Sequence, residues 1–196
     1  QAVIKHIESL GAWLCSVRSY DMFTGEEFNS GFYEDGEFYV YDTGFRLQGE
    51  APHLIMKSVH GFDQREMLIR FALTGSEGDL DLLTEDDPYL RGKWAATLWF
   101  LLKSGTIAKI DGLDNISTDK RIIANVQRLY EGDKILSEWI GTEKQVLTRL
   151  YLVCDSKEEL ADALKYYMDT VKVYDDNGNR MVLRGFDVDN ALMLNC

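Results

Sequence analysis

The sequence contains few of the residues that mark specialised protein classes. Its 196 residues include only two prolines and three cysteines, and 21 Lys and Arg stand against 33 Asp and Glu. The net charge of −12 argues against nucleic acid and anionic membrane surfaces as partners, because both bind clustered cations. The longest apolar stretch, WAATLWFLL, is too short to span a bilayer as a helix. The composition predicts a soluble globular protein with a sizeable core.

Cysteine usage and the first residues bear on the origin of the chain. Cys15, Cys154 and Cys196 form no CxxC or CxxH spacing, and the first two lie in apolar, strand-like runs. Buried free thiols in a reducing cytoplasm are expected, and no signal peptide is visible. The chain begins QAVIKHIESLG, which enters a helical pattern without an initiator methionine. We therefore expect a fragment of a longer protein.

Hydrophobic periodicity and turn signals predict an α+β fold with a mainly antiparallel sheet flanked by helices. Asp35-Gly36 and Asn177-Gly178 are dipeptides typical of tight hairpin turns, which predicts hairpins at 28–42 and 171–183. Ser156 opens an S-x-x-E capping box before a helix, and Gly75 is expected to cap another helix. Further strands are predicted at 13–20, 93–102, 106–113 and 145–155, and helices at 2–10, 67–74, 117–130 and 158–168. Trp94, Trp99 and Phe100 are predicted core residues.

Residues 39–50, YVYDTGFRLQGE, place an acid, a glycine, an arginine and a second acid along one exit from a strand. Counting back from the predicted turn sets Asn29 opposite Asp42, and oxygen ligands of this kind suit Mg²⁺. Gly44 would let a ligand approach the backbone. Arg46 could hold a phosphate or carboxylate, and Glu50 could act as a general base.

A plainer interpretation of the same residues stays open. Asp42 and Gly44 are also typical of an ordinary turn after a strand, in which the Asp side chain accepts backbone N–H groups. Arg46 and Glu50 could form a surface ion pair worth ~0–1 kcal/mol. His53 and His60 alone make a weak zinc proposal, so both are expected to be structural, with His53 near enough to Glu50 to line a site.

The runs DGEFYVYDTGFRLQGEAPH and HGFDQREMLIRFALTG resemble the C-terminal part of the ATP-grasp domain. The nearest patterns belong to biotin carboxylase and to carboxylate–amine ligases related to carbamoyl-phosphate synthase. The resemblance implies that Asp42 binds metal and that Arg46 faces substrate and phosphate. Gly44 stands where the family usually has asparagine, and Glu50 where biotin carboxylases keep the glutamate that deprotonates bicarbonate.

The resemblance also implies a domain organisation. Residues 93–116 and 141–181 resemble the biotin-carboxylase-like C-terminal subdomain. The implied division is residues 1–90 as the C-terminal portion of the ATP-grasp domain and 91–196 as that subdomain. Asn29 and Ser30 depart from the family, because many members have a second metal-binding acid near position 30. No glycine-rich, lysine-bearing loop is found either.

Together these features imply part of an ATP- and Mg²⁺-dependent ligase. It would join a small carboxylate to an amine or thiol through an acyl phosphate, with the missing N-terminal domains of the same chain completing the site. The alternative is a non-catalytic dimerisation or docking module, in which the hairpin 171–183 and the strand 93–102 pair across a two-fold axis of a homodimer.

Overall fold

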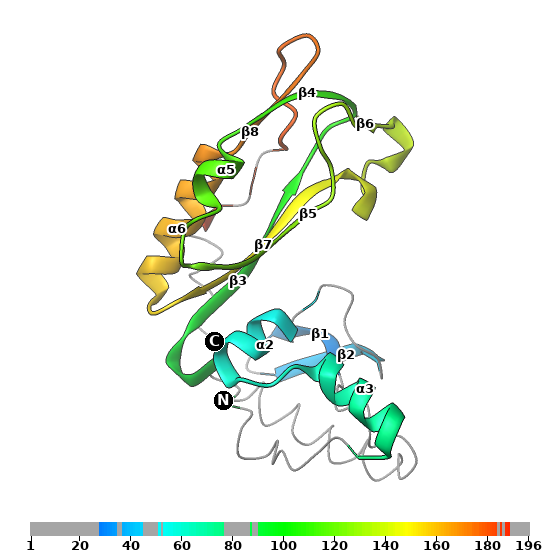
Figure 1. The fold of residues 1–196 in the computed structure, drawn as a ribbon, viewed down its shortest axis with the longest axis vertical. Helices are drawn as coiled ribbons and strands as arrows, with labels where there is room; N and C mark the ends of the chain where they lie inside the picture. Colours follow the sequence, from blue (N-terminus) through cyan, green and yellow to red (C-terminus); the bar gives the residue numbers. More distant parts are fainter. Residues whose placement is uncertain are drawn as a thin grey trace. The chain divides into compact units, whose positions relative to one another are not determined.

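The computed structural model describes residues 28–34, 37–44, 51, 53–76, 87, 90–183, 185, 187 and 188. For residues 28–44 it describes the backbone alone. The chain divides into two compact units between Arg91 and Gly92 (Figure 1). The segments predicted at 2–10 and 13–20 lie outside the described residues, as do Asp35-Gly36, Cys15 and Cys196.

The first unit contains the predicted hairpin. Strands β1 (Phe28–Glu34) and β2 (Glu37–Gly44) pair antiparallel, which confirms both arms. The pairing runs regularly from Glu34↔Glu37 to Gly31↔Val40 and then shifts, so that Ser30 pairs with Asp42 and Tyr41 is the extra residue of a β-bulge. The predicted pairing of Asn29 with Asp42 is wrong by one position, because Asn29 pairs with Thr43. A count from the turn cannot foresee such an insertion.

Two helices follow the hairpin. Helix α2 spans His53–His60 and helix α3 spans Gln64–Thr74. Gly75 caps α3 in the left-handed conformation with φ 74°, and its N–H donates to the carbonyl of Phe71, so the predicted cap is confirmed. Such a φ favours glycine because it has no Cβ. No residue of α3 is buried, and Ile69 and Leu73 are largely exposed.

The second unit contains two three-stranded antiparallel sheets. Their strand orders are β3-β7-β5 and β6-β4-β8. The strands are β3 (Trp94–Leu101), β4 (Gly105–Asp111), β5 (Ile122–Gln127), β6 (Lys134–Ile135), β7 (Val146–Cys154) and β8 (Lys172–Asp175), with short 3₁₀ helices at Leu90–Gly92, Ser137–Trp139 and Glu143–Gln145. The strands predicted at 93–102, 106–113 and 145–155 are confirmed.

Residues 180–183 join the two sheets into one antiparallel surface. Val182 bridges Leu102, and the N–H of Lys103 donates to the carbonyl of Met181 at 2.8 Å. On the opposite side, the N–H of Met181 donates to the carbonyl of Val173 at 2.9 Å. The hairpin predicted around Asn177-Gly178 is confirmed. Residues 101–102 and 182–183 belong to the strand 93–102 and the hairpin 171–183, which the docking alternative expects to pair with a second copy. They pair with each other within the chain instead.

The helix predicted at 117–130 is wrong. The chain makes one helical turn, α5 (Leu113–Ile116), and then forms β5, which pairs with β7. Ile122, Ile123 and Val126 are β-branched and favour strands. Their pairing partners lie about 25 residues later in the chain, where local periodicity gives no sign of them.

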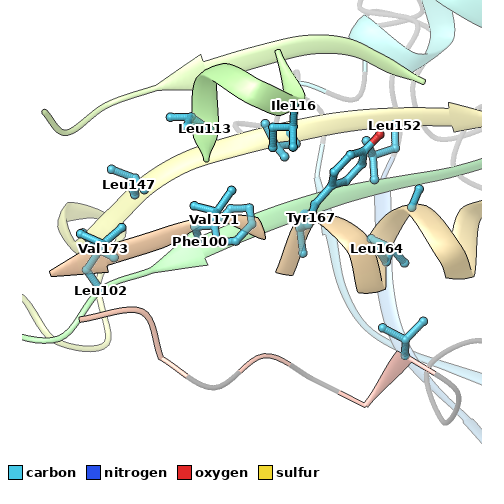
Figure 2. Close-up of a cluster of buried hydrophobic side chains, with 14 of the residues drawn as sticks. Phe100, Leu102, Leu113, Ile116, Leu147, Leu152, Leu164, Tyr167, Val171 and Val173 are labelled. Carbon is cyan, nitrogen blue, oxygen red and sulfur yellow. The ribbon is translucent and has the colours of Figure 1, made fainter. Parts of the chain in front are cut away.

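Helix α6 (Lys157–Thr170) covers the core of the second unit. The Ser156 hydroxyl accepts the N–H of Glu159 at 3.1 Å, and the Glu159 carboxylate accepts the N–H of Asp155 at 2.8 Å, which confirms the predicted capping signal. Figure 2 shows Tyr167 reaching from α6 towards β7 and α5. The buried face of the helix consists of Leu160, Ala163, Leu164 and Tyr167.

Strand β7 lies in the middle of its sheet, and eight of its nine residues are buried. Buried and exposed residues therefore do not alternate along it, as expected for a strand covered on both faces. Phe100 is confirmed as core at 2% exposure, whereas Trp94 at the edge is 40% exposed. None of the described helices is long and apolar enough to cross a membrane.

Candidate functional site

The structure positions three of the five predicted site residues along the backbone of the hairpin. Asp42 and Gly44 belong to the last three residues of β2, opposite Ser30 and Phe28 of β1. Asn29 lies next to Ser30 and pairs with Thr43. The other two, Arg46 and Glu50, lie outside the described residues.

The β-bulge falls immediately before Asp42. Tyr41 is the inserted residue, so the strand bends and gains twist at the position that precedes the carboxylate. Bulges are frequent beside active sites, where they redirect a side chain or end the pairing. The backbone at the end of β2 therefore has a local irregularity at the residue for which the sequence predicts metal binding.

A second backbone irregularity follows Glu50. Ala51 has a φ of 59°, a left-handed conformation that costs free energy in a residue with a Cβ. Its carbonyl accepts the N–H of Leu54 at 3.1 Å, which fixes the first turn of α2. Strained residues of this kind concentrate at ligand-binding sites.

His53 and His60 occupy the two ends of α2, and both are buried. Burial, with a smaller contribution from the positive charge of Arg65, lowers the pKa of His53. This shift favours the uncharged form of the imidazole. The ring of His60 stacks on Phe62 with 5.8 Å between centroids. Across the described part of the chain, no three His, Cys, Asp or Glu side chains group closely enough to hold a metal ion.

Asp63 organises the junction between the two helices. Its side chain is 1% exposed and accepts the N–H of Arg65 at 2.9 Å, the N-cap bond of α3. The Arg65 guanidinium donates to the same carboxylate at 3.0 Å, and the Lys57 ammonium lies 3.5 Å from it. These bonds, those from Arg65 above all, hold the pKa of Asp63 well below its usual range. Lys57 also pairs with Glu66 at 2.5 Å.

The depressed pKa of Asp63 predicts a pH dependence of stability. Because the folded pKa lies below the unfolded value, the ionised carboxylate contributes stability above about pH 4 and loses it as pH falls further. Asp63→Asn keeps an oxygen that can cap α3 but removes the charge. We expect the free energy of unfolding to fall more steeply between about pH 5 and about pH 2 in the wild type than in this variant.

Denaturant unfolding across that pH range measures the effect. Asp162→Asn is the matched control, because Asp162 is an exposed carboxylate on α6. That variant should keep the wild-type slope. Equal slopes in wild type and Asp63→Asn would contradict the assigned role of the ion pair.

Comparison with known proteins finds similar structures but no similar sequence family. No family model matches the sequence, and no curated protein matches it either. The structure is similar to the crystal structure of L-amino acid ligase from Bacillus licheniformis, with a TM-score of 0.58 and 23% identity over 74% of this chain and 34% of that chain. It is also similar to phosphoribosylglycinamide synthetase from Anaerococcus prevotii, with a TM-score of 0.61 and 13% identity over 76% of this chain and 37% of that chain.

Both of these proteins are ATP-grasp enzymes, so the chain has an ATP-grasp-like fold. The resemblance of the sequence to the ATP-grasp domain is therefore confirmed at the level of the fold. The α+β class with antiparallel sheets is confirmed as well. The chain spans about a third of the length of each of these two structures.

Proposed function

We propose that the chain supplies one wall of the active site of an ATP- and Mg²⁺-dependent ligase. The reaction would join a small carboxylate to an amine, or to a thiol, through an acyl phosphate. The ATP-grasp-like fold carries the proposal, with the predicted metal-binding Asp42 at the end of β2 directly after a bulge. Polypeptide beyond these 196 residues would supply the rest of the site.

The residues at the end of the hairpin fit a magnesium ion by their chemistry. Mg²⁺ prefers hard oxygen ligands and usually takes one or two from protein, with phosphates and water completing its shell. The Asp42 carboxylate is such a ligand and would carry the proposed metal contact. Asn29 pairs with Thr43, one residue beyond the partner of Asp42, so the alternation of strand side chains sets Asn29 on the opposite face of the hairpin. When bound, the metal would neutralise charge on the ATP phosphates. Gly44 would leave room for those phosphates beside the backbone.

Arg46 and Glu50 complete the proposed chemistry. A guanidinium can hold a phosphate or a carboxylate through two parallel hydrogen bonds. Arg46 would therefore orient the substrate carboxylate and stabilise the charge that develops on the transferred phosphoryl group. Glu50 would accept the proton that the attacking nucleophile loses. The left-handed Ala51 beside Glu50 supports a site at this turn.

We also propose that the protein works in the reducing cytoplasm. Cys154 is buried and forms no disulfide, and burial raises the pKa of its thiol to about 11. A thiol of this kind is mostly uncharged and poorly reactive. Its role is packing in β7, which suits a compartment where thiols stay reduced.

The test is a nucleotide-turnover assay on the longer polypeptide that contains these residues. It would be incubated with ATP, Mg²⁺, candidate amino acids as carboxylates, and amines. We expect ADP and phosphate to appear only when a suitable carboxylate is present, and hydroxylamine to trap the activated carboxylate as a hydroxamate. Release of AMP and pyrophosphate would rule out the acyl phosphate, and absence of any turnover in the full screen would contradict the ligase proposal.

The second candidate is a docking module derived from the same fold. Asn29 and Ser30, in place of an acid near position 30, favour it, as do the exposed apolar side chains of Ile69 and Leu73 on α3. Sedimentation of the 196-residue chain separates the two. A homodimer that Leu73→Glu dissociates, together with absent ATP turnover by the longer polypeptide, would favour docking over catalysis.

A further inference from the structure

The second unit contains a pocket that the proposed ATP site does not use. It has a volume of about 480 Å³ and lies between the C-terminal end of α6 and the described residues of the following segment, 180–183 and 185. That volume is within the usual range for small-molecule sites. Leu98 and Phe100 of β3, each 2% exposed, form part of its lining, and Met168 of α6 and Val182 add further apolar surface.

The pairing of residues 180–183 explains how the pocket forms. Val182 bridges Leu102 at the end of β3, so the segment continues the sheet beyond that strand. Gly185 then passes close to α6, where a Cβ would lie 2.5 Å from the Met168 sulfur. The absence of a side chain at Gly185 lets the segment approach the helix there. The pocket is thus enclosed by regular elements on one side and by a paired segment on the other.

Three charged side chains line this otherwise apolar pocket. Lys103 and Arg180 are close along the sheet, because the N–H of Lys103 donates to the carbonyl of Met181, the residue after Arg180. Asp169 contributes a carboxylate from α6. Within the described part of the chain, none of these three side chains has an ion pair or a side-chain hydrogen bond. Two cationic groups and one carboxylate are therefore available to a ligand.

We propose that this pocket binds an α-amino acid with a large apolar side chain. The ligand carboxylate would pair with Arg180 and Lys103, since charge-assisted bonds to a carboxylate are the strong ones. The ligand ammonium would pair with Asp169. Its side chain would pack against Met168 and Val182. The inference goes beyond the proposed ligase function, because all these residues belong to the second unit and none holds ATP or metal.

Calorimetric titration of the 196-residue chain with L-phenylalanine tests the proposal. We expect saturable binding, and binding weaker by about tenfold or more for glycine, phenylacetate and phenethylamine, which each lack one of the three recognised groups. Arg180→Gln and Lys103→Gln should each weaken L-phenylalanine binding by about tenfold. Asp169→Asn should weaken L-phenylalanine binding but leave phenylacetate binding unchanged. Lys134→Gln, an exposed lysine on β6 that does not line the pocket, should change nothing.

Several results would overturn the assignment. The absence of heat up to about 10 mM L-phenylalanine would remove the site. Binding that survives both Arg180→Gln and Lys103→Gln would place the ligand elsewhere. Equal affinity for phenylacetate and L-phenylalanine would contradict recognition of the ammonium group by Asp169. None of these outcomes depends on ATP turnover, so the inference can fail while the proposed ligase function stands.

Discussion

Asp42→Asn should abolish ATP-dependent ligation in the longer polypeptide, and Arg46→Ala should do the same, each lowering kcat by about a thousandfold or more. The Asp42 variant loses the negative charge that would hold Mg²⁺ on the ATP phosphates, although its shape is nearly unchanged. The Arg46 variant loses the positive charge that would stabilise the transferred phosphoryl group. Both losses act on the transition state, so they should appear in kcat as well as in KM.

The control must separate loss of chemistry from loss of fold. Asp176→Asn makes the same chemical change in an exposed turn of the second unit and should keep wild-type turnover. The thermal midpoints of all three variants should lie close to that of the wild type. Turnover that is unchanged in both Asp42→Asn and Arg46→Ala would refute the proposed site.

Tyr167→Ala should destabilise the second unit by about 3–5 kcal/mol, the cost of removing a large aromatic ring from a packed core. Tyr167 is 0% exposed and belongs to the same buried cluster as Phe100, Leu152 and Val171 (Figure 2). The guanidinium of Arg121 also lies over its ring, 5.6 Å from the centroid. Denaturant unfolding followed by near-ultraviolet circular dichroism measures the change.

Tyr166, the neighbour of Tyr167 on α6, provides the matched control. Tyr166 is 48% exposed, so Tyr166→Ala should cost less than about 1 kcal/mol. Tyr167→Phe keeps the ring and removes the buried hydroxyl, so it should cost much less than Tyr167→Ala. Similar losses in the two alanine variants would contradict the burial that the structure assigns to Tyr167.

Features that depend on neighbouring residues could be predicted from the sequence. The hairpins, the Ser156 cap and the Gly75 cap follow from short-range chemistry, such as a two-residue turn or a side chain that bonds a backbone N–H three residues later. Strand β3 was also predictable from its composition, although Trp94 is exposed because it begins an edge strand.

Features that depend on distant partners could not be predicted. Residues 122–127 form a strand because they pair with β7 through backbone hydrogen bonds. That pairing outweighs the helical periodicity of the segment. Residues 180–183 pair on both sides for the same reason. In the candidate site, the bulge at Tyr41 moved the partner of Asp42 from Asn29 to Ser30. Nothing in the residue types around Tyr41 marks that insertion.

The residues of the candidate site also divide into those that the sequence could predict and those that it could not. Asp42 and Gly44 were predictable because they end a clear strand, and the structure keeps them there. The junction at Asp63 was not singled out, since its ammonium partner Lys57 comes from a different helix. The D-x-R spacing of Asp63 and Arg65 was a usable signal, because an N-cap aspartate accepts the N–H two residues later.

The magnesium dependence of ATP affinity tests the central claim most directly. In the longer polypeptide, Mg²⁺ should strengthen ATP binding by about tenfold or more, because Asp42 would help to hold the metal that neutralises charge on the phosphates. Asp42→Asn should remove that gain while leaving metal-free ATP binding unchanged. The same Mg²⁺-dependent gain in wild type and Asp42→Asn would contradict a metal-binding role for the carboxylate at the end of β2.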